Sequence, residues 1–304
     1  QTYMKWHLIN DFSSNLSIEF EQQQFSFYST ILLGVNVMKP RWKRALSKSN
    51  NYVGEQIGKL FVEQYFPEES KQKVMDLINN INAVFKERVQ KLDWMGEETK
   101  VKALDKLSKF TYKIGYPDEW KDYSDIEIDS KSLIQNVMNA TYFGYLENVN
   151  RLGKPIDKGE WGMTPQTINA YYNPRMNEIV FPAAILQPPF FNPDADDAIN
   201  YGGIGGVIGH EFSHGFDDQG SKANGEGNLS DWWKAEDRSN FNERTAKLVN
   251  QFNAYEVPDN HHVNGELTLG ENIADISGIT LAYYALVKSF EGKEEPAEID
   301  GYNY

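Results

Sequence analysis

Residues 201–215 read YGGIGGVIGHEFSHG, which is unusually rich in glycine for a helix. Its glycines at 202, 203, 205, 206 and 209 would weaken an exposed helix by up to about 1 kcal/mol each, because glycine loses the most backbone freedom on folding. A helix of this composition is stable only when it is packed tightly against its neighbours. We therefore expect residues 201–215 to form a buried helix.

The same stretch contains His210, Glu211 and His214 in the spacing H-E-x-x-H. Two residues four apart on an α-helix differ by about 40° in direction, so both imidazoles project from one face and can share one metal ion. Imidazole nitrogens suit zinc, and a catalytic zinc site keeps one position open, so a third protein ligand is needed. Glu211 flanks this face and would take a proton from a water that attacks a carbonyl group.

The best candidate for the third ligand is Glu271, in the sequence GENIAD over residues 270–275. It stands at the start of an apolar run that reaches Phe290. Asp275 lies four residues further on and shares a helical face with Glu271, so one acid would bind the metal while the other orients a histidine. Metal-bound imidazoles usually donate their second N–H to a carboxylate or carbonyl, and Asp275 and Asp217 are the candidates for that role.

Each of these residues also has a simpler interpretation. The two histidines of the motif could form hydrogen bonds inside a core, and any single acid could cap a helix or be solvated. His261 and His262 precede Asn264 and Gly265 in a polar loop, and we interpret them as two solvated histidines.

The first half of the chain is predicted to be helical. Apolar residues recur at three- and four-residue spacing over residues 13–33 and 42–66, and Pro67, followed by acids, begins another helix. Further helices are expected after Gly96 and over residues 132–152. The predicted core face of the helix that starts at Pro67 is Val74, Leu77, Ile78, Ile81, Val84, Phe85, Val89 and Leu92.

The pattern changes after the Gly-Lys-Pro sequence at residues 153–155. Two short β-type runs, residues 167–172 and 178–181, are separated by an Asn-Pro turn signal and predict a hairpin. We therefore expect an α+β protein that is mostly α-helical, with a helical scaffold over residues 1–150 and a metal-binding lobe over residues 151–304.

The composition excludes several classes of protein. The chain has 304 residues, no cysteine, 30 Lys and Arg against 44 Asp and Glu, and a net charge of −14. A disulfide scaffold is impossible, nucleic acid is not expected as a partner, and no segment approaches the roughly 20 apolar residues of a membrane span. We expect a monomer. The absence of cysteine favours a cytoplasmic location and leaves the cell surface or secretion open.

The sequence HEFSHGFDD (210–218), followed about sixty residues after its first histidine by GENIAD, resembles the neprilysin family of zinc metallopeptidases, gluzincins whose third ligand is a glutamate. Further family-like blocks are NAYY (169–172), VFPAAILQPPFF (180–191), NYGGIG (200–205), DWW (231–233), DWM (93–95) and IGYP (114–117). The resemblance extends over essentially the whole chain. Because the chain lacks cysteine, it is most similar to the bacterial oligopeptidase O branch.

The resemblance implies one Zn²⁺ per chain and a role for each residue of the motifs. The zinc ligands would be His210, His214 and Glu271. Glu211 would be the general base. Asp275, which the resemblance also places among the catalytic residues, and Asp217 would be the hydrogen-bond partners of the two histidines.

The resemblance also implies a thermolysin-like zinc peptidase lobe with a small β-hairpin or sheet, beside a helical domain that helps to close a cavity. Asn169 and Ala170 would hold the peptide backbone, as expected for an exposed strand edge. Ile185, Phe190 and Val207 would line the pocket for the residue after the scissile bond. The expected activity is that of a zinc-dependent endopeptidase, which cleaves oligopeptides on the amino side of hydrophobic residues by Glu-assisted attack of zinc-bound water.

Family members continue at both ends, with an oxyanion-stabilising histidine and a substrate-binding arginine in the C-terminal part. Neither residue can be assigned here, so we expect a fragment that lacks the N-terminal part and the C-terminal end. Two alternatives stay open: a catalytically impaired zinc- or peptide-binding fragment, and a pseudo-enzyme that serves as an adhesion or scaffold protein.

Overall fold

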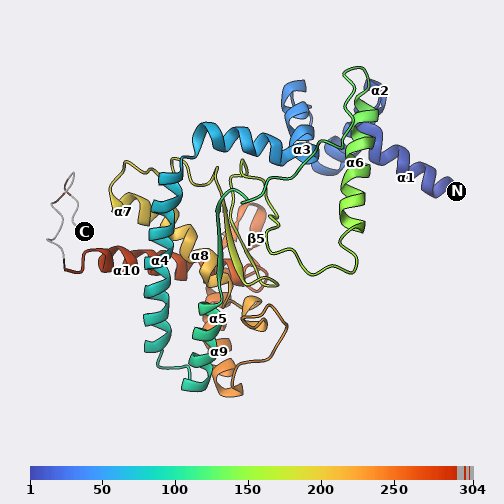
Figure 1. The fold of residues 1–304 in the computed structure, drawn as a ribbon. Coiled ribbons are helices and arrows are strands. Elements are labelled where there is room, and N and C mark those ends of the chain that lie inside the picture. The colour runs from blue at the N-terminus through green and yellow to red at the C-terminus, as the bar shows by residue number, and fades with distance from the viewer. Residues whose placement is uncertain (293–297, 299–300, 302–304) are drawn as a thin grey trace. The chain divides into compact units, whose positions relative to one another are not determined.

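The computed structural model describes residues 1–292, 298 and 301, and the protein in this part is mostly helical with small sheets (Figure 1). The predicted α+β class is confirmed. The longer helices are α1 (Thr2–Phe12), α2 (Ile18–Gln24), α3 (Arg41–Tyr65), α4 (Glu68–Lys91), α5 (Glu97–Ser108), α6 (Leu133–Val149), α8 (Gly206–His214), α9 (Ala235–Asn253) and α10 (Leu269–Ser289). The short segments are α7 (Asp197–Asn200), the 3-10 helices Ser13–Asn15, Gly220–Lys222 and Pro258–Asn260, and the π-helices Phe25–Ile31 and Tyr201–Gly205.

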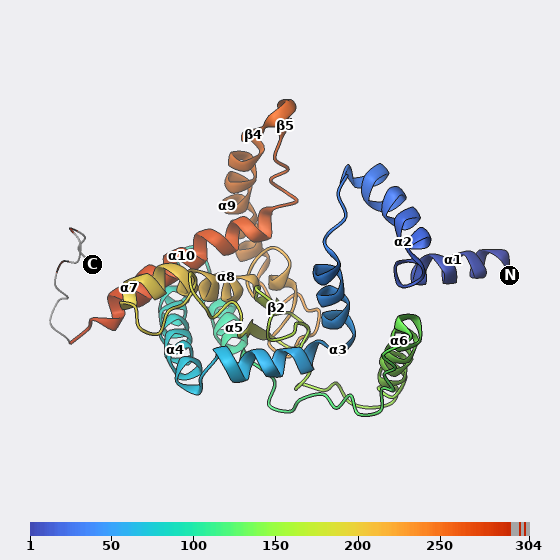
Figure 2. The ribbon, with the colours of Figure 1, turned by 90° about the horizontal axis from the view of Figure 1, so that it is seen from above.

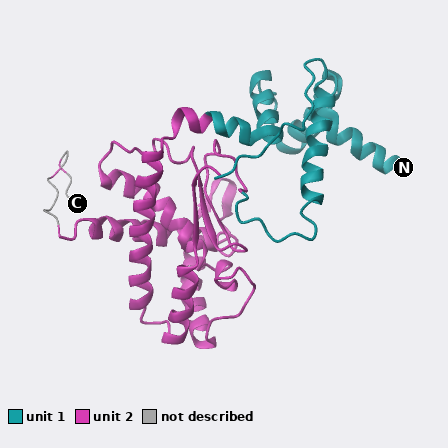
Figure 3. Ribbon diagram, in the orientation of Figure 1, with its two compact units in different colours: residues 1–60, 118–160 teal, residues 61–117, 161–304 magenta. Residues whose placement is uncertain are grey.

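The chain divides into two compact units, residues 1–60 with 118–160 and residues 61–117 with 161–304 (Figure 3). This division differs from the predicted boundary at residue 150. The reason is that residues 61–117 supply α4, α5 and β1 to the second unit, and β1 pairs with β3, which lies 67 positions further along the chain. At the end of the predicted lobe (151–304), residues 293–297, 299–300 and 302–304 lie outside the described residues.

Local sequence signals account for several helix boundaries. Pro67 is the extended residue before α4, and the acids Glu68 and Glu69 occupy the first turn of that helix. All the predicted core positions of α4 are buried, and Leu92, just beyond the helix, is partly buried. In the first unit, the side chain of Ser132 caps α6 by accepting a hydrogen bond from the Gln135 N–H. No helix among the described residues is both long enough and apolar enough to cross a membrane.

The second unit contains a three-stranded sheet of β1 (Thr111–Gly115), β3 (Glu178–Pro182) and β2 (Tyr171–Asn173), in that order. Strands β2 and β3 form the predicted antiparallel hairpin, although the first strand begins later than expected. Strand β1 pairs with β3 in parallel and was not predicted from the sequence. Because β3 lies between the other two strands, every residue of it is buried, whereas β2 lies at an edge. A separate pair, β4 (Glu256–Val257) and β5 (His261–His262), is exposed.

The glycine-rich stretch forms the π-helix of residues 201–205 followed by α8, and it is buried as predicted. Ile204, Ile208 and Phe212, four apart, are each 0% exposed. On another face, α8 lies along α10 (Figures 1 and 2). A Cβ atom at Gly209 would lie 2.6 Å from the carbonyl oxygen of Gly278, and one at Gly278 would lie 2.6 Å from the backbone nitrogen of His210. The two helices therefore touch backbone to backbone.

We expect Gly209→Ala to lower the free energy of unfolding by about 1–3 kcal/mol, because the added methyl group would push α10 away from α8. Urea denaturation of both proteins measures the difference. Gly202→Ala is the matched control, since a Cβ atom at Gly202 has no neighbour within 4 Å. A Gly209→Ala protein as stable as the control would show that the contact between the two helices can relax.

Candidate metal centre

Two helices bring three side chains together. His210 and His214 project from the C-terminal half of α8, and Glu271 lies in the first turn of α10. The Glu271 Oε2 atom is 3.3 Å from His210 Nε2 and 3.6 Å from His214 Nε2. One ligand atom of each residue lies within 4.8 Å of the other two, and this is the predicted ligand group.

The other ring nitrogen of each histidine faces a carboxylate. His210 Nδ1 lies 2.8 Å from Asp275 Oδ1, and His214 Nδ1 lies 2.8 Å from Asp217 Oδ2. An ionised carboxylate can only accept, so each imidazole donates from Nδ1 and keeps the lone pair of Nε2 free. Both histidines thus have the tautomer and orientation that a metal ligand requires. Their hydrogen-bond partners, Asp275 and Asp217, are the two acids that the sequence analysis named for this role.

The dimensions of this group fit a zinc ion. Zinc bonds of about 2.0–2.1 Å in tetrahedral geometry place neighbouring ligand atoms about 3.3–3.4 Å apart. The two Nε2 to Oε2 distances, 3.3 and 3.6 Å, are close to that value. Two neutral imidazoles and one carboxylate are also a donor set that zinc uses when one position is left for water or substrate. The residues present therefore fit zinc.

Glu211 lies between the two histidines and is only 5% exposed. Burial raises the pKa of its carboxyl group to about 7. The charge of His214 and a hydrogen bond from the Tyr172 backbone N–H oppose this rise, whereas the charge of Glu271 adds to it. Its Oε2 atom is buried and has no hydrogen-bond partner in the described part of the chain. Such a carboxylate has a free lone pair and a pKa suited to accepting and returning a proton near neutral pH.

Asp217 is held more firmly than a surface acid. Its carboxylate is buried, and its Oδ1 atom accepts hydrogen bonds from the backbone N–H groups of Gln219 (2.8 Å) and Gly220 (2.7 Å). Burial lowers the pKa of His214, but the hydrogen bond to Asp217 and the charges of Glu211, Asp217 and Glu271 outweigh burial and leave the pKa raised. The imidazole is therefore a more basic ligand than a free histidine.

The predicted substrate residues differ in how deeply they are buried. Val207 stands one turn before Glu211 on α8 and is half-buried, as is Phe190, whereas Ile185 is buried. All three belong to the same hydrophobic cluster. Asn169 and Ala170 directly precede the edge strand β2, and the Ala170 N–H donates to the Asn169 side chain at 2.9 Å.

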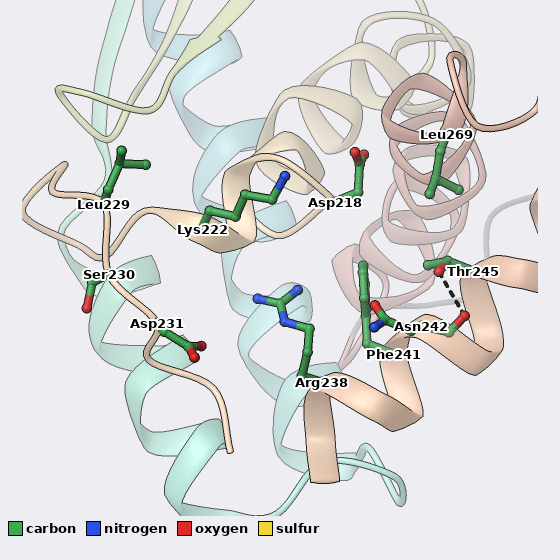
Figure 4. A pocket seen from close by; sticks show the side chains of 10 residues that line it. All are labelled: Asp218, Lys222, Leu229, Ser230, Asp231, Arg238, Phe241, Asn242, Thr245 and Leu269. Atoms are coloured by element: carbon green, nitrogen blue, oxygen red, sulfur yellow. Dashed lines mark hydrogen bonds between the residues drawn. The ribbon is translucent and has the colours of Figure 1, made fainter. Parts of the chain in front are cut away.

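A separate cavity of about 700 Å³ lies beside the loop that follows α8 (Figure 4). Its lining includes Asp218, Lys222, Arg238, Phe241 and Leu269, and Figure 4 shows these side chains around it. None of the predicted site residues lines this cavity. The histidines 261 and 262 are exposed in the β4–β5 pair, as expected for solvated side chains.

The structure adds residues that the sequence analysis did not select. The N–H of Tyr172 reaches Glu211, and the buried Lys106 holds the loop that carries Asp217. A signal for Lys106 was present, because it lies three residues after Ala103 and beside Leu107, on the apolar face of α5. A lysine at a core-facing position of a helix is unusual unless its charge has buried partners.

Two family models match the chain. Both are described as peptidase family M13, one over residues 1–117 and the other over residues 169–303. The chain belongs to peptidase family M13. The resemblance to neprilysin is thereby confirmed. This M13 chain is 37% identical to human neprilysin, in a match that covers 94% of the chain and 39% of neprilysin. It is also 37% identical to the endothelin-converting enzyme homolog of Locusta migratoria, in a match that covers 99% of the chain and 42% of that protein.

Solved structures of bacterial relatives agree with this assignment. The zinc metalloprotease ZMP1 of Mycobacterium tuberculosis, in complex with an inhibitor, matches with a TM-score of 0.91 and 46% identity, over 98% of this chain and 46% of that one. PepO from Lactobacillus rhamnosis matches with a TM-score of 0.81 and 31% identity, over 91% of this chain and 44% of that one. The M13 chain thus spans less than half the length of these relatives.

The raised pKa of Glu211 predicts an effect on stability in the metal-free protein. The folded state holds the Glu211 proton up to about pH 7, whereas the unfolded state loses it near 4.5, so wild-type stability falls as pH rises between these values. Glu211→Gln carries no charge and should therefore be more stable than wild type at pH 8, by on the order of 1–3 kcal/mol, and about equally stable at pH 4.

Urea denaturation at both pH values in the presence of a chelator measures this difference. Glu266→Gln is the control, since Glu266 is exposed and its substitution should change neither value. Equal stability of wild type and Glu211→Gln at pH 8 would contradict the assignment of a costly buried charge to Glu211.

Proposed function

We propose that this chain forms the zinc site of a metalloendopeptidase that hydrolyses oligopeptides. His210, His214 and Glu271 are the ligands of one zinc ion, and Glu211 is the general base. The observation that carries the proposal is the convergence of the two Nε2 atoms on Glu271 Oε2 while each Nδ1 is occupied by a carboxylate 2.8 Å away. A pair of histidines that only satisfied a core would not leave both Nε2 lone pairs directed at a third ligand.

A zinc ion held by His210, His214 and Glu271 would supply Lewis acidity at the scissile carbonyl and a water of lowered pKa. Glu211 takes the proton from that water and then returns it to the leaving nitrogen. Burial raises the pKa of the Glu211 carboxyl group in the metal-free site, which favours a group that can both accept and return a proton. Asp217 and Asp275 keep the imidazoles in the tautomer that binds metal, and Asp275 acts in the reaction only through His210.

The edge strand β2 is the proposed binding strand for the peptide backbone. The Tyr172 N–H points to Glu211 and thus away from β3, which places the outward edge of β2 beside the general base. Residues two apart in a strand present their backbone groups to the same side, so Ala170 shares this edge with Tyr172. An extended peptide added here would run past Glu211, with Ala170 and Asn169 as its partners.

The side chain that follows the scissile bond would pack on Val207, Phe190 and Ile185. Val207 precedes Glu211 by four residues, so it lies on the same side of α8 as the base. The apolar surface that Val207 and Phe190 leave exposed favours substrates with bulky hydrophobic residues at this position.

Glu211→Gln should keep the zinc ion and lower kcat/KM for an oligopeptide by about 10²–10⁴-fold, because the amide cannot accept the proton. Zinc content and cleavage are measured on the same full-length preparation. Glu243→Gln, on the exposed face of α9, is the control and should cleave normally. Near-normal cleavage by Glu211→Gln would refute the proposed role.

Val207→Phe should reduce kcat/KM about 10–100-fold for peptides with Phe or Leu after the scissile bond, and much less for peptides with Ala there, because the larger ring fills the pocket. A peptide library varied at that position measures the change in preference. Ile199→Phe is the matched control, since Ile199 is 58% exposed on α7. An unchanged preference in Val207→Phe would place the pocket elsewhere.

A further inference from the structure

Lys106 is among the most completely buried side chains in the protein, with 1% of its surface exposed. Its ammonium group donates hydrogen bonds to three backbone carbonyl oxygens: Gly215 at 2.6 Å, Gly220 at 2.7 Å and Ala223 at 2.8 Å. An ammonium group has three donors, so all of them are used. The side chain thus reaches from α5 to a segment more than a hundred residues away in the sequence.

These partners are unusual for a buried charge. No carboxylate among the described residues lies within salt-bridge distance of Lys106, and its other neighbours are the rings of Phe216 and Tyr172, 5.4 and 5.7 Å from Nζ. Burial accordingly lowers the pKa of the Lys106 ammonium to about 7, against the attraction of the Asp217 charge. Folding stability alone would favour an apolar residue at this position of α5, since an unpaired buried charge is costly.

The three carbonyl groups bracket Asp217 in the sequence. Gly215 directly follows α8. Gly220 lies in the turn in which the Asp217 carboxylate accepts hydrogen bonds from the Gln219 and Gly220 N–H groups, and Ala223 follows that turn. The same turn places Asp217 Oδ2 beside His214 Nδ1. Lys106 therefore holds both ends of the loop formed by residues 215–223. Within this loop, the Asp217 side chain contacts the proposed zinc ligand His214.

We propose that Lys106 is a positioning residue of the metal centre: its ammonium group holds residues 215–223 so that Asp217 orients His214 for zinc. This inference rests on the proposed function, in which His214 is a zinc ligand. Lys106 does not contact zinc or substrate and acts through Asp217.

A second contact links Lys106 to the other side of the site. Its backbone carbonyl accepts a hydrogen bond from Asn177 Nδ2 at 3.0 Å, and the Asn177 Oδ1 atom accepts one from the Tyr172 hydroxyl at 3.0 Å. Tyr172 is the residue whose backbone N–H reaches Glu211. One residue of α5 thus connects the loop behind His214 with the strand beside the general base.

The test compares wild type, Lys106→Met, Asp217→Asn and the double variant in the full-length protein. Partners that orient a metal-bound histidine typically contribute 10–100-fold to metal affinity, so we expect Lys106→Met to bind zinc at least about 10-fold more weakly in chelator competition. In the Asp217→Asn background the same substitution should weaken binding less than about threefold further, because both changes act on one contact. The visible spectrum of the Co²⁺-loaded protein should change in the same way in both single variants.

Lys109→Met is the matched control. Lys109 lies one residue beyond α5, is exposed, and pairs with Asp105 and Glu226, so its loss removes a charge near the same loop without touching the three carbonyl groups. Its zinc affinity and Co²⁺ spectrum should equal those of wild type. Lys106→Gln, whose amide retains two donor hydrogens, replaces Lys106→Met if that variant does not fold, and the same comparisons apply to it.

Wild-type zinc affinity and spectrum in a folded Lys106 variant would overturn the inference. Losses that add fully in the double variant would also overturn it, since Lys106 would then not act through Asp217. If neither variant folds, Lys106 supports the whole unit instead of the loop, and the inference is again wrong. A wild-type protein that binds no zinc would instead refute the proposed function itself.

Discussion

The metal centre depends on the backbone contact between α8 and α10. Gly209 and Gly278 have no side chains, so the two helices approach closely enough for Glu271, in the first turn of α10, to reach both histidines of α8. Asp275, one turn later, then meets His210. A side chain of any size between the helices would move both acids away together, because they share one rigid helix. The glycines that weaken α8 as an isolated helix are therefore what lets it form a site.

The site has a buried half and an exposed half. Glu211, Asp217 and Lys106 are buried and held by neighbours from β2, the loop after α8, and α5. The Glu271 and Asp275 side chains are 68% and 76% exposed and are placed mainly by the backbone of α10. Burial raises the pKa of Glu211, the proposed general base.

Local patterns were sufficient for much of the fold. The start of α4 next to Pro67, its apolar face, a helix within residues 132–152 and the hairpin of β2 and β3 each depend on residues within one segment, and each was predicted. Strand β1 was missed because five residues carry little periodicity and its parallel partner β3 lies 67 positions further along the chain. The same pairing joins residues 61–117 to the second unit, which is why the predicted boundary at residue 150 differs from the observed division.

Residue spacing was enough to select the candidate metal ligands. Helical geometry places residues four apart on one face, so the H-E-x-x-H spacing put His210 and His214 side by side and made Glu271 the best candidate for a third ligand; the resemblance to the neprilysin family then implied that role for Glu271. Contacts between distant segments set which ring nitrogen each carboxylate occupies, how deeply Glu211 is buried, and that Lys106 holds the loop behind His214. These properties come from contacts between segments as much as 117 residues apart, and spacing within a single helix carries no information about them.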